Sequence, residues 1–200
     1  RTFGAWRPAN AIRSATVSVL PRDVPGAPRF VMVDRPGAPQ SHVLVVERGP
    51  ERGSRDYIPL VVANTILGGM FSSRINLNLR EAHGYTYGAR SGFAFRRGGG
   101  PFVVGGAIQA PSTAPAVREI FAELRRMRET DVTPDELAAA QARVAETLPA
   151  RFETAEETAG AVGELFVFGL PDNEYATLAT RIRAVTAADV RRVANAYLHP

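Results

Sequence analysis

The stretch at residues 67–93, LGGMFSSRINLNLREAHGYTYGARSGF, decides the fold because the apolar period changes within it. Between residues 71 and 79 an apolar side chain recurs at every fourth position, which predicts a helix, and Gly84 is placed to end it. From Tyr85 to residue 95 the period is two, which predicts a long strand. We therefore expect a helix that leads directly into a strand.

On the N-terminal side of this stretch, the sequence predicts two strands and a buried helix. Residues 30–33 and 42–47 are short valine-rich runs separated by a Pro-Gly turn, which is typical of strand, turn and strand. Residues 55–67 are apolar nearly all round and follow a serine that can cap a helix. We expect this helix to stop at Gly68 and Gly69.

The first part of the chain has a different character. Residues 1–28 are rich in proline and are interpreted as a linker or N-terminal arm with room for one short strand at 15–20, so the folded domain is expected over 29–200. The chain starts at Arg1 without a methionine or an export signal, and we expect it to be part of a longer protein. A soluble protein of the bacterial periplasm or of the cytoplasm is compatible with this, and the compartment stays unknown.

On the C-terminal side, the pattern predicts a hairpin followed only by helices. Residues 102–109 come after a glycine-rich turn and should pair with the strand before it. A clear apolar stripe marks the next helix, and capping-box patterns at Thr133 and Thr154 open two more. Thr186, with Asp189 three residues on, opens the last helix. The expected helices cover about residues 117–128, 133–148, 154–169, 173–184 and 187–197.

The order of these elements defines the fold class. Strands come first, then two helices, a hairpin and several helices. Such segregation predicts an α+β fold in which an antiparallel-rich mixed sheet is covered on one face by helices.

Composition excludes several classes of protein. The chain has 200 residues, 45% of them hydrophobic, which suits one globular domain with a real core. Its net charge of +4 comes entirely from arginine and is spread along the chain, which argues against a nucleic-acid groove. Cysteine is absent, so disulfides and thiolate chemistry are excluded. The longest apolar run, at residues 57–71, is too short for a membrane span.

No complete catalytic apparatus can be found in the sequence. The three histidines, His42, His83 and His199, lack partners at the spacing of zinc ligands, since neither H-E-x-x-H nor H-x-x-E-H occurs. There is no G-x-S-x-G motif, and a Walker A loop would need a lysine that the chain lacks. We therefore expect no metal site and no cofactor in this chain.

The 67–93 stretch nevertheless resembles a known signature. It is similar to the C-terminal half of M16-family zinc peptidases, the group of pitrilysin, insulin-degrading enzyme and mitochondrial processing peptidase, which reads approximately Leu-Gly-Gly, Phe-Ser-Ser-Arg-Leu, Asn-Leu-Arg-Glu, Gly-Tyr-x-Tyr. Ile75 stands where leucine is usual. The resemblance extends over most of residues 29–198, including VDRPGAPQSHVLV at 33–45.

The resemblance implies a fold and a role for each half of the peptidase. The fold would be of the LuxS/MPP-like metallohydrolase type, and the chain would be the inactive domain, without peptidase activity alone. In the family a zinc-bearing half carries H-x-x-E-H and the other half closes over the peptide substrate. Zinc is thus expected only in the partner half, either upstream in the same chain or on a separate subunit. A homodimer is a further possibility.

The resemblance also implies candidate substrate-binding residues. An arginine and a tyrosine of the non-zinc half contact the peptide in the family, and the matching positions are Arg80 and Tyr85, with Tyr87 as the alternative tyrosine. A guanidinium offers fixed donors to peptide carbonyls, and a phenol can donate to a developing oxyanion. Gly68 and Gly69 are candidates for a loop that faces the substrate.

Each of these residues has a simpler structural role as an alternative. An arginine late in a helix often binds carbonyls, tyrosines on a sheet pack, and paired glycines stop helices. At the level of function, the alternatives are a structural, non-proteolytic M16-like subunit and, more weakly supported, a basic nucleic-acid-binding domain.

Overall fold

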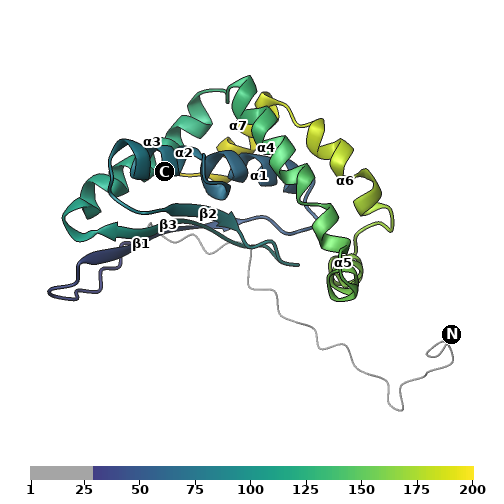
Figure 1. Cartoon of the computed structure of the whole chain (residues 1–200), viewed down its shortest axis with the longest axis horizontal. Coiled ribbons are helices and arrows are strands. Elements are labelled where there is room, and N and C mark those ends of the chain that lie inside the picture. The colour runs from purple at the N-terminus through teal and green to yellow at the C-terminus, as the bar shows by residue number, and fades with distance from the viewer. Residues whose placement is uncertain (1–28) are drawn as a thin grey trace, which may run out of the picture. The chain divides into compact units, whose positions relative to one another are not determined.

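We describe the protein from a computed structural model in which residues 29–200 can be placed. The predicted short strand at 15–20 lies outside these described residues. Residues 34–200 form one compact unit. Within it, a single sheet and a layer of helices on one side of that sheet produce the expected α+β arrangement (Figure 1).

Within residues 29–200 the sheet has three strands, β1 (Gln40–Gly49), β2 (Ala89–Phe93) and β3 (Gly100–Gln109), in the order β1-β3-β2. Both pairings are antiparallel. β2 and β3 form the predicted hairpin with Phe93 opposite Phe102, while β1 pairs along its whole length with β3. Every strand pairing in the described residues is therefore antiparallel, within the α+β class that the sequence predicts.

Side chains alternate across this sheet, so its two faces differ. Val43 of β1 and Phe102 and Val104 of β3 are buried beneath the helices. Leu44 and Val46 of β1 point the other way and are more than half exposed, at 54% and 58%. One face of the sheet therefore builds the core, and the other keeps apolar side chains accessible.

The helices account for most of the remaining chain. A π-helical turn, η1, continues α1, and a second π-helical turn, η2, continues the short α2. The elements are α1 (Tyr57–Asn64), η1 (Thr65–Gly69), α2 (Arg74–Asn76), η2 (Leu77–Ala82), η3 (Ala110–Ser112), α3 (Thr113–Glu129), α4 (Pro134–Glu146), η4 (Pro149–Phe152), α5 (Ala155–Phe168), α6 (Glu174–Arg183) and α7 (Ala187–Tyr197).

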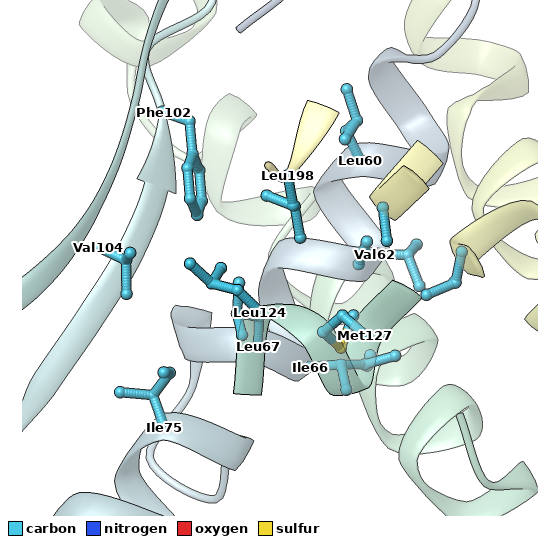
Figure 2. Packing of buried hydrophobic residues seen from close by; sticks show 14 of the residues in the cluster. Leu60, Val62, Ile66, Leu67, Ile75, Phe102, Val104, Leu124, Met127 and Leu198 are labelled. Atoms are coloured by element: carbon cyan, nitrogen blue, oxygen red, sulfur yellow. The ribbon is translucent and has the colours of Figure 1, made fainter. Parts of the chain in front are cut away.

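The hydrophobic core lies between β3 and the helices. Figure 2 shows Phe102 on the sheet side of this core and Leu67 and Leu124 on the helical side. Each of these side chains is almost completely buried. Removing such a side chain from water contributes about 1.5–3 kcal/mol to folding. The 67–93 stretch is thus part of the core from its first residue.

Local signals at the helix ends are confirmed. Thr133, Thr154 and Thr186 each accept a hydrogen bond from the backbone N–H three residues on, and an acidic side chain at that position bonds back to the cap. Gly84 and Gly169 have left-handed backbones, with φ of 64° and 63°, so they end helices without the strain that a Cβ would cause.

Three expectations are wrong in detail. Residues 30–33 form no strand, since an apolar run becomes a strand only where it pairs with another. The strand expected from Tyr85 begins at Ala89 and ends at Phe93. Phe71 precedes the helix and is 70% exposed instead of sharing a buried face with Ile75 and Leu79. In each case the apolar period is present in the sequence but does not set where the element begins or ends.

Buried ion pairs attach the C-terminal helices to the start of α1. Arg52 donates to Glu174 of α6, which also accepts from Arg181, and both bonds involve a carboxylate that is almost fully buried. Burial opposes ionisation, but the two guanidiniums hold the pKa of Glu174 below its usual value. This network positions α6 against the N-terminal end of α1.

The segment Tyr57–Ala82 is long and apolar enough to cross a membrane by length and composition. In this structure 61% of its most apolar window is buried inside the protein. Its apolar character is accounted for by the core that it builds.

Candidate functional site

A cavity of about 590 Å³ opens where η1 ends and β2 begins. Nearly all of its lining comes from the 67–93 stretch, and one residue, on α4, comes from elsewhere in the chain. The lining residues are Gly68, Gly69, Met70, Phe71, Ser72, Asn76, Tyr87, Gly88, Ala89, Arg90 and Arg143. The cavity is therefore built by the stretch that carries the family resemblance.

Gly68 brings the helical wall of the cavity into contact with the strand wall. A Cβ on Gly68 would lie 2.5 Å from the backbone nitrogen of Ser91 and 2.6 Å from its hydroxyl. At Gly69 an added Cβ would lie 3.1 Å from the carbonyl oxygen of Asn64. The two glycines end η1, as predicted, and Gly68 in addition permits a close approach that no other residue would allow.

Two asparagines hold these walls together, and sequence reasoning did not identify either of them. Asn64 accepts a hydrogen bond of 2.7 Å from the Ser91 hydroxyl. Asn76 accepts one of 3.0 Å from the backbone N–H of Ala89, and its Nδ2 donates to the carbonyl of Met70 at 3.3 Å. The only signal in the sequence was a polar side chain within an apolar helical run.

The two candidate tyrosines lie in different surroundings. Tyr87 is 90% exposed and lines the cavity. Tyr85 is partly buried against the core and stacks on the ring of His83, with 4.8 Å between ring centroids. Between them the hydroxyl of Thr86 donates to the carbonyl of Ala107 at 2.6 Å. Tyr85 and Tyr87 therefore do not share one strand face, contrary to expectation.

Arg80 lies next to the cavity but does not line it. Its guanidinium stacks over the ring of Phe71 at 4.1 Å, and Phe71 is a lining residue. One of its nitrogens is 3.5 Å from Glu81, and the side chain is about a third exposed. The structure thus brings Gly68, Gly69 and Tyr87 together, with Arg80 behind Phe71 and Tyr85 apart.

Arg74, in contrast, is part of the interior. It makes two short hydrogen bonds of 2.6 and 2.8 Å to the carboxylate of Glu136, and only 5% of its side chain is exposed. The bonds from Arg74 lower the pKa of Glu136 to about 2. Because Glu136 also completes the capping box of Thr133, this pair attaches the start of α4 to α2.

The cavity has a positive rim. Arg90 on β2 and Arg143 on α4 both line it, and both are exposed. Within residues 29–200, no aspartate or glutamate lines it. The site can therefore offer guanidinium and phenol donors, but no general base.

No metal centre is found in the described part of the chain. Residues 29–200 contain no group of three or more histidine, cysteine, aspartate or glutamate side chains that could hold a metal ion. His199 lies 3.1 Å from Glu47 at the end of α7, and His83 stacks on Tyr85. These residues do not fit a zinc ion.

A second, smaller cavity of about 300 Å³ lies between α1, α4 and α6. Its lining is mainly apolar and includes Val61 and Leu148. The one arginine at its edge, Arg151, is already paired with Glu164 at 2.6 Å. This cavity lacks the converging polar groups of a ligand site.

Comparison with known proteins places the chain in a family. The family model described as the peptidase M16 inactive domain matches residues 1–144, and the chain belongs to this family. The absence of a zinc motif is in keeping with that description. No curated protein matches the chain.

Solved structures share the fold. The peptidase M16 inactive domain of Pseudomonas fluorescens has a TM-score of 0.75 at 24% identity, covering 80% of this chain and 38% of that one. A Helicobacter pylori protease also has a TM-score of 0.75, at 20% identity, and the match covers 84% of this chain and 40% of that one. The inactive peptidase domain of a Bordetella parapertussis protein has a TM-score of 0.71 at 23% identity, and the match covers 84% of this chain and 91% of that one. The chain thus spans about two fifths of the first two proteins.

Proposed function

We propose that this chain is the substrate-binding, non-catalytic half of a zinc peptidase. In this proposal, a peptide in extended conformation lies across the cavity between η1 and β2. The observation that carries the proposal is the exposure of Tyr87 over an open cavity that the family motif itself builds. A tyrosine that served only packing would have its ring covered, as the ring of Tyr85 partly is.

Each candidate residue then has a distinct role. Gly68 and Gly69 present backbone without side chains, so a peptide can approach the wall closely. The Tyr87 hydroxyl donates to a peptide carbonyl, and the Arg80 guanidinium, held against Phe71, adds positive charge beside it. Tyr85 is the second candidate for the tyrosine role.

The catalytic zinc would belong to another half, because the described residues here do not fit it. That half would lie upstream in the same polypeptide or on a separate subunit. Apolar side chains available for such a contact include Leu44 and Val46 on the open sheet face and Phe166 on α5, all exposed. A second copy of this chain could occupy the same surfaces.

The test uses the complex with the zinc-bearing half, with its formation first checked by sedimentation. Peptide turnover is then compared for Arg80→Ala, Tyr85→Phe, Tyr87→Phe and the unchanged complex. We expect Arg80→Ala and Tyr87→Phe to lower kcat/KM about ten- to a thousandfold, which is typical of losing one positioned donor. Melting temperature should hardly change for Tyr87→Phe, because only an exposed hydroxyl is removed.

Matched controls are available in the chain. Tyr85→Phe removes the same hydroxyl away from the cavity, and Arg125→Ala removes an exposed arginine on α3. If none of Arg80→Ala, Tyr85→Phe and Tyr87→Phe changes turnover of the folded complex, the substrate-binding role is wrong. A structural, non-proteolytic subunit would then be the better description. If Tyr85→Phe alone lowers turnover, the two tyrosines have been assigned the wrong way round.

A further inference from the structure

We infer that the cavity recognises a carboxylate on the bound peptide through Arg90 and Arg143. This inference rests on the proposed function and adds a chemical class of substrate to it. A peptide with an aspartate or glutamate side chain, or a free C-terminal carboxylate, at the cavity would be preferred over a neutral one.

The first argument is the position of the two arginines. Arg90 comes from β2 and Arg143 from α4, elements that are far apart in sequence and meet only in the tertiary structure. Both line the same cavity of about 590 Å³. Guanidinium groups from two walls can donate to one carboxylate, whose two oxygens accept several hydrogen bonds.

The second argument is that neither guanidinium is already used. Within residues 29–200 the side chains of Arg90 and Arg143 have no hydrogen-bond or ion-pair partner. Some other surface arginines are already paired, as Arg181 is with Glu174 at 2.6 Å and Arg192 is with Asp56 at 2.8 Å. The donors at the cavity are therefore free for a ligand.

The third argument is that no described side chain in the cavity competes with a ligand for the two arginines. Among the described residues of its lining there is no acidic side chain, and the amide of Asn76 is committed to Ala89 and Met70. An unpaired positive rim in a concave site attracts negative charge and gives a cation no favourable contact. An anionic group on the substrate is the complementary partner.

The experiment measures peptide binding by calorimetry to the complex with the zinc-bearing half, after a chelator has removed the metal to prevent cleavage. Three short peptides of alanine, serine and valine are used. One has blocked ends and a central glutamate, one has blocked ends and glutamine instead, and one has the glutamine and a free C-terminal carboxylate. We expect a carboxylate to tighten binding about three- to tenfold.

The matched variants carry equal changes in net charge. Arg90→Gln with Arg143→Gln should abolish the preference for the carboxylate peptides over the neutral peptide. Arg118→Gln with Arg125→Gln, two exposed arginines on α3 away from the cavity, should keep the preference. Because the arginines are exposed, the preference should also shrink at high salt.

The outcomes separate this inference from the proposed function. If all three peptides bind equally, the carboxylate inference is wrong and peptide binding stands. If no peptide binds, the proposed function fails as well. If both double variants lose the preference equally, general electrostatics explains it and the cavity arginines do not. Tighter binding of only one carboxylate peptide supports the inference and identifies whether a side chain or the C-terminus is the source.

Discussion

Both halves of the 67–93 stretch contain glycine, an arginine and an aromatic side chain, but they differ in burial. Residues 67–79 are largely buried, with Gly68 against β2 and Arg74 paired inside the protein. Residues 80–90 are mostly exposed and include Tyr87 and Arg90 at the cavity. The first half builds the walls of the site, and the second half supplies the groups that face solvent.

The difference shows that residue type does not reveal a residue's role in such a motif. Arg74 and Arg80 are six positions apart on one helical segment, yet one is 5% exposed and the other about a third exposed. What separates them is the presence of Glu136 on α4 beside Arg74. A buried guanidinium needs such a partner because an unpaired buried charge is costly.

The largest effect is expected at Gly68. Gly68→Ala places a Cβ 2.5 Å from the backbone nitrogen of Ser91, and a strand backbone cannot move aside easily. We expect the free energy of unfolding to fall by about 2–3 kcal/mol, as for other overpacked sites. Chemical denaturation measures this.

Gly88→Ala is the matched control in the second half of the stretch. Its added Cβ would meet only Asn76, at 3.8 Å, which is ordinary contact. We expect a change within about 0.5 kcal/mol. Equal destabilisation by the two substitutions would contradict the conclusion that Gly68 lies at a close contact and Gly88 does not.

A somewhat smaller loss is expected when the buried arginine is replaced. Arg74→Met removes both hydrogen bonds to Glu136 and leaves its carboxylate partly buried without a cation, so stability should fall by about 2 kcal/mol. Arg80→Met removes a surface contact of 3.5 Å to Glu81 and should cost less than about 1 kcal/mol. Thermal melts of both variants compare them; a greater loss for Arg80→Met would reverse our assignment.

The smallest effect concerns the pH dependence of the same pair. Arg74 lowers the pKa of Glu136 from 4.5 to about 2, so the stabilisation is fully present above pH 4.5 and is lost as pH falls towards 2. Allowing for screening by solvent, we expect roughly 1–2 kcal/mol from this group. Urea unfolding at a series of pH values measures it.

Other carboxylates with lowered pKa values, such as Glu174 and Asp189, add their own pH dependence. The Arg74→Met variant isolates the contribution of Glu136, because the other two carboxylates keep their partners in it. Its stability should decline less between pH 4.5 and 2 than that of the unchanged protein. Parallel declines would mean that Arg74 does not lower the pKa of Glu136.

Much of the local structure could be predicted because it depends on neighbours in sequence. The capping boxes at Thr133, Thr154 and Thr186 need only a side chain three residues away, and they formed as predicted. Gly84 ended its helix because only glycine adopts a left-handed backbone without strain. The limits of the strand after Tyr85 were wrong because strand length depends on a partner distant in the chain.

The candidate site was predicted only in part for the same reason. The motif identified Gly68, Gly69 and Tyr87, which line one cavity, because it includes the turn that encloses that cavity. Arg143 was missed because α4 approaches the cavity only after folding. Asn64 and Asn76 were missed because their hydrogen bonds go to β2, well beyond the reach of any helical spacing rule.

The sequence by itself determined the α+β class, the helix ends and the membership of the peptidase M16 inactive-domain family, since periodicity, caps and a contiguous motif are local properties. Only the tertiary structure decided which polar side chains became interior partners and which became the rim of a cavity. Burial of Arg74 requires Glu136 on another helix, and the presence of Arg90 and Arg143 in the lining of one cavity requires a strand and a helix to come to the same place in the fold. Such contacts join residues that are distant in the chain, and their free energies arise only when the core packs the elements together.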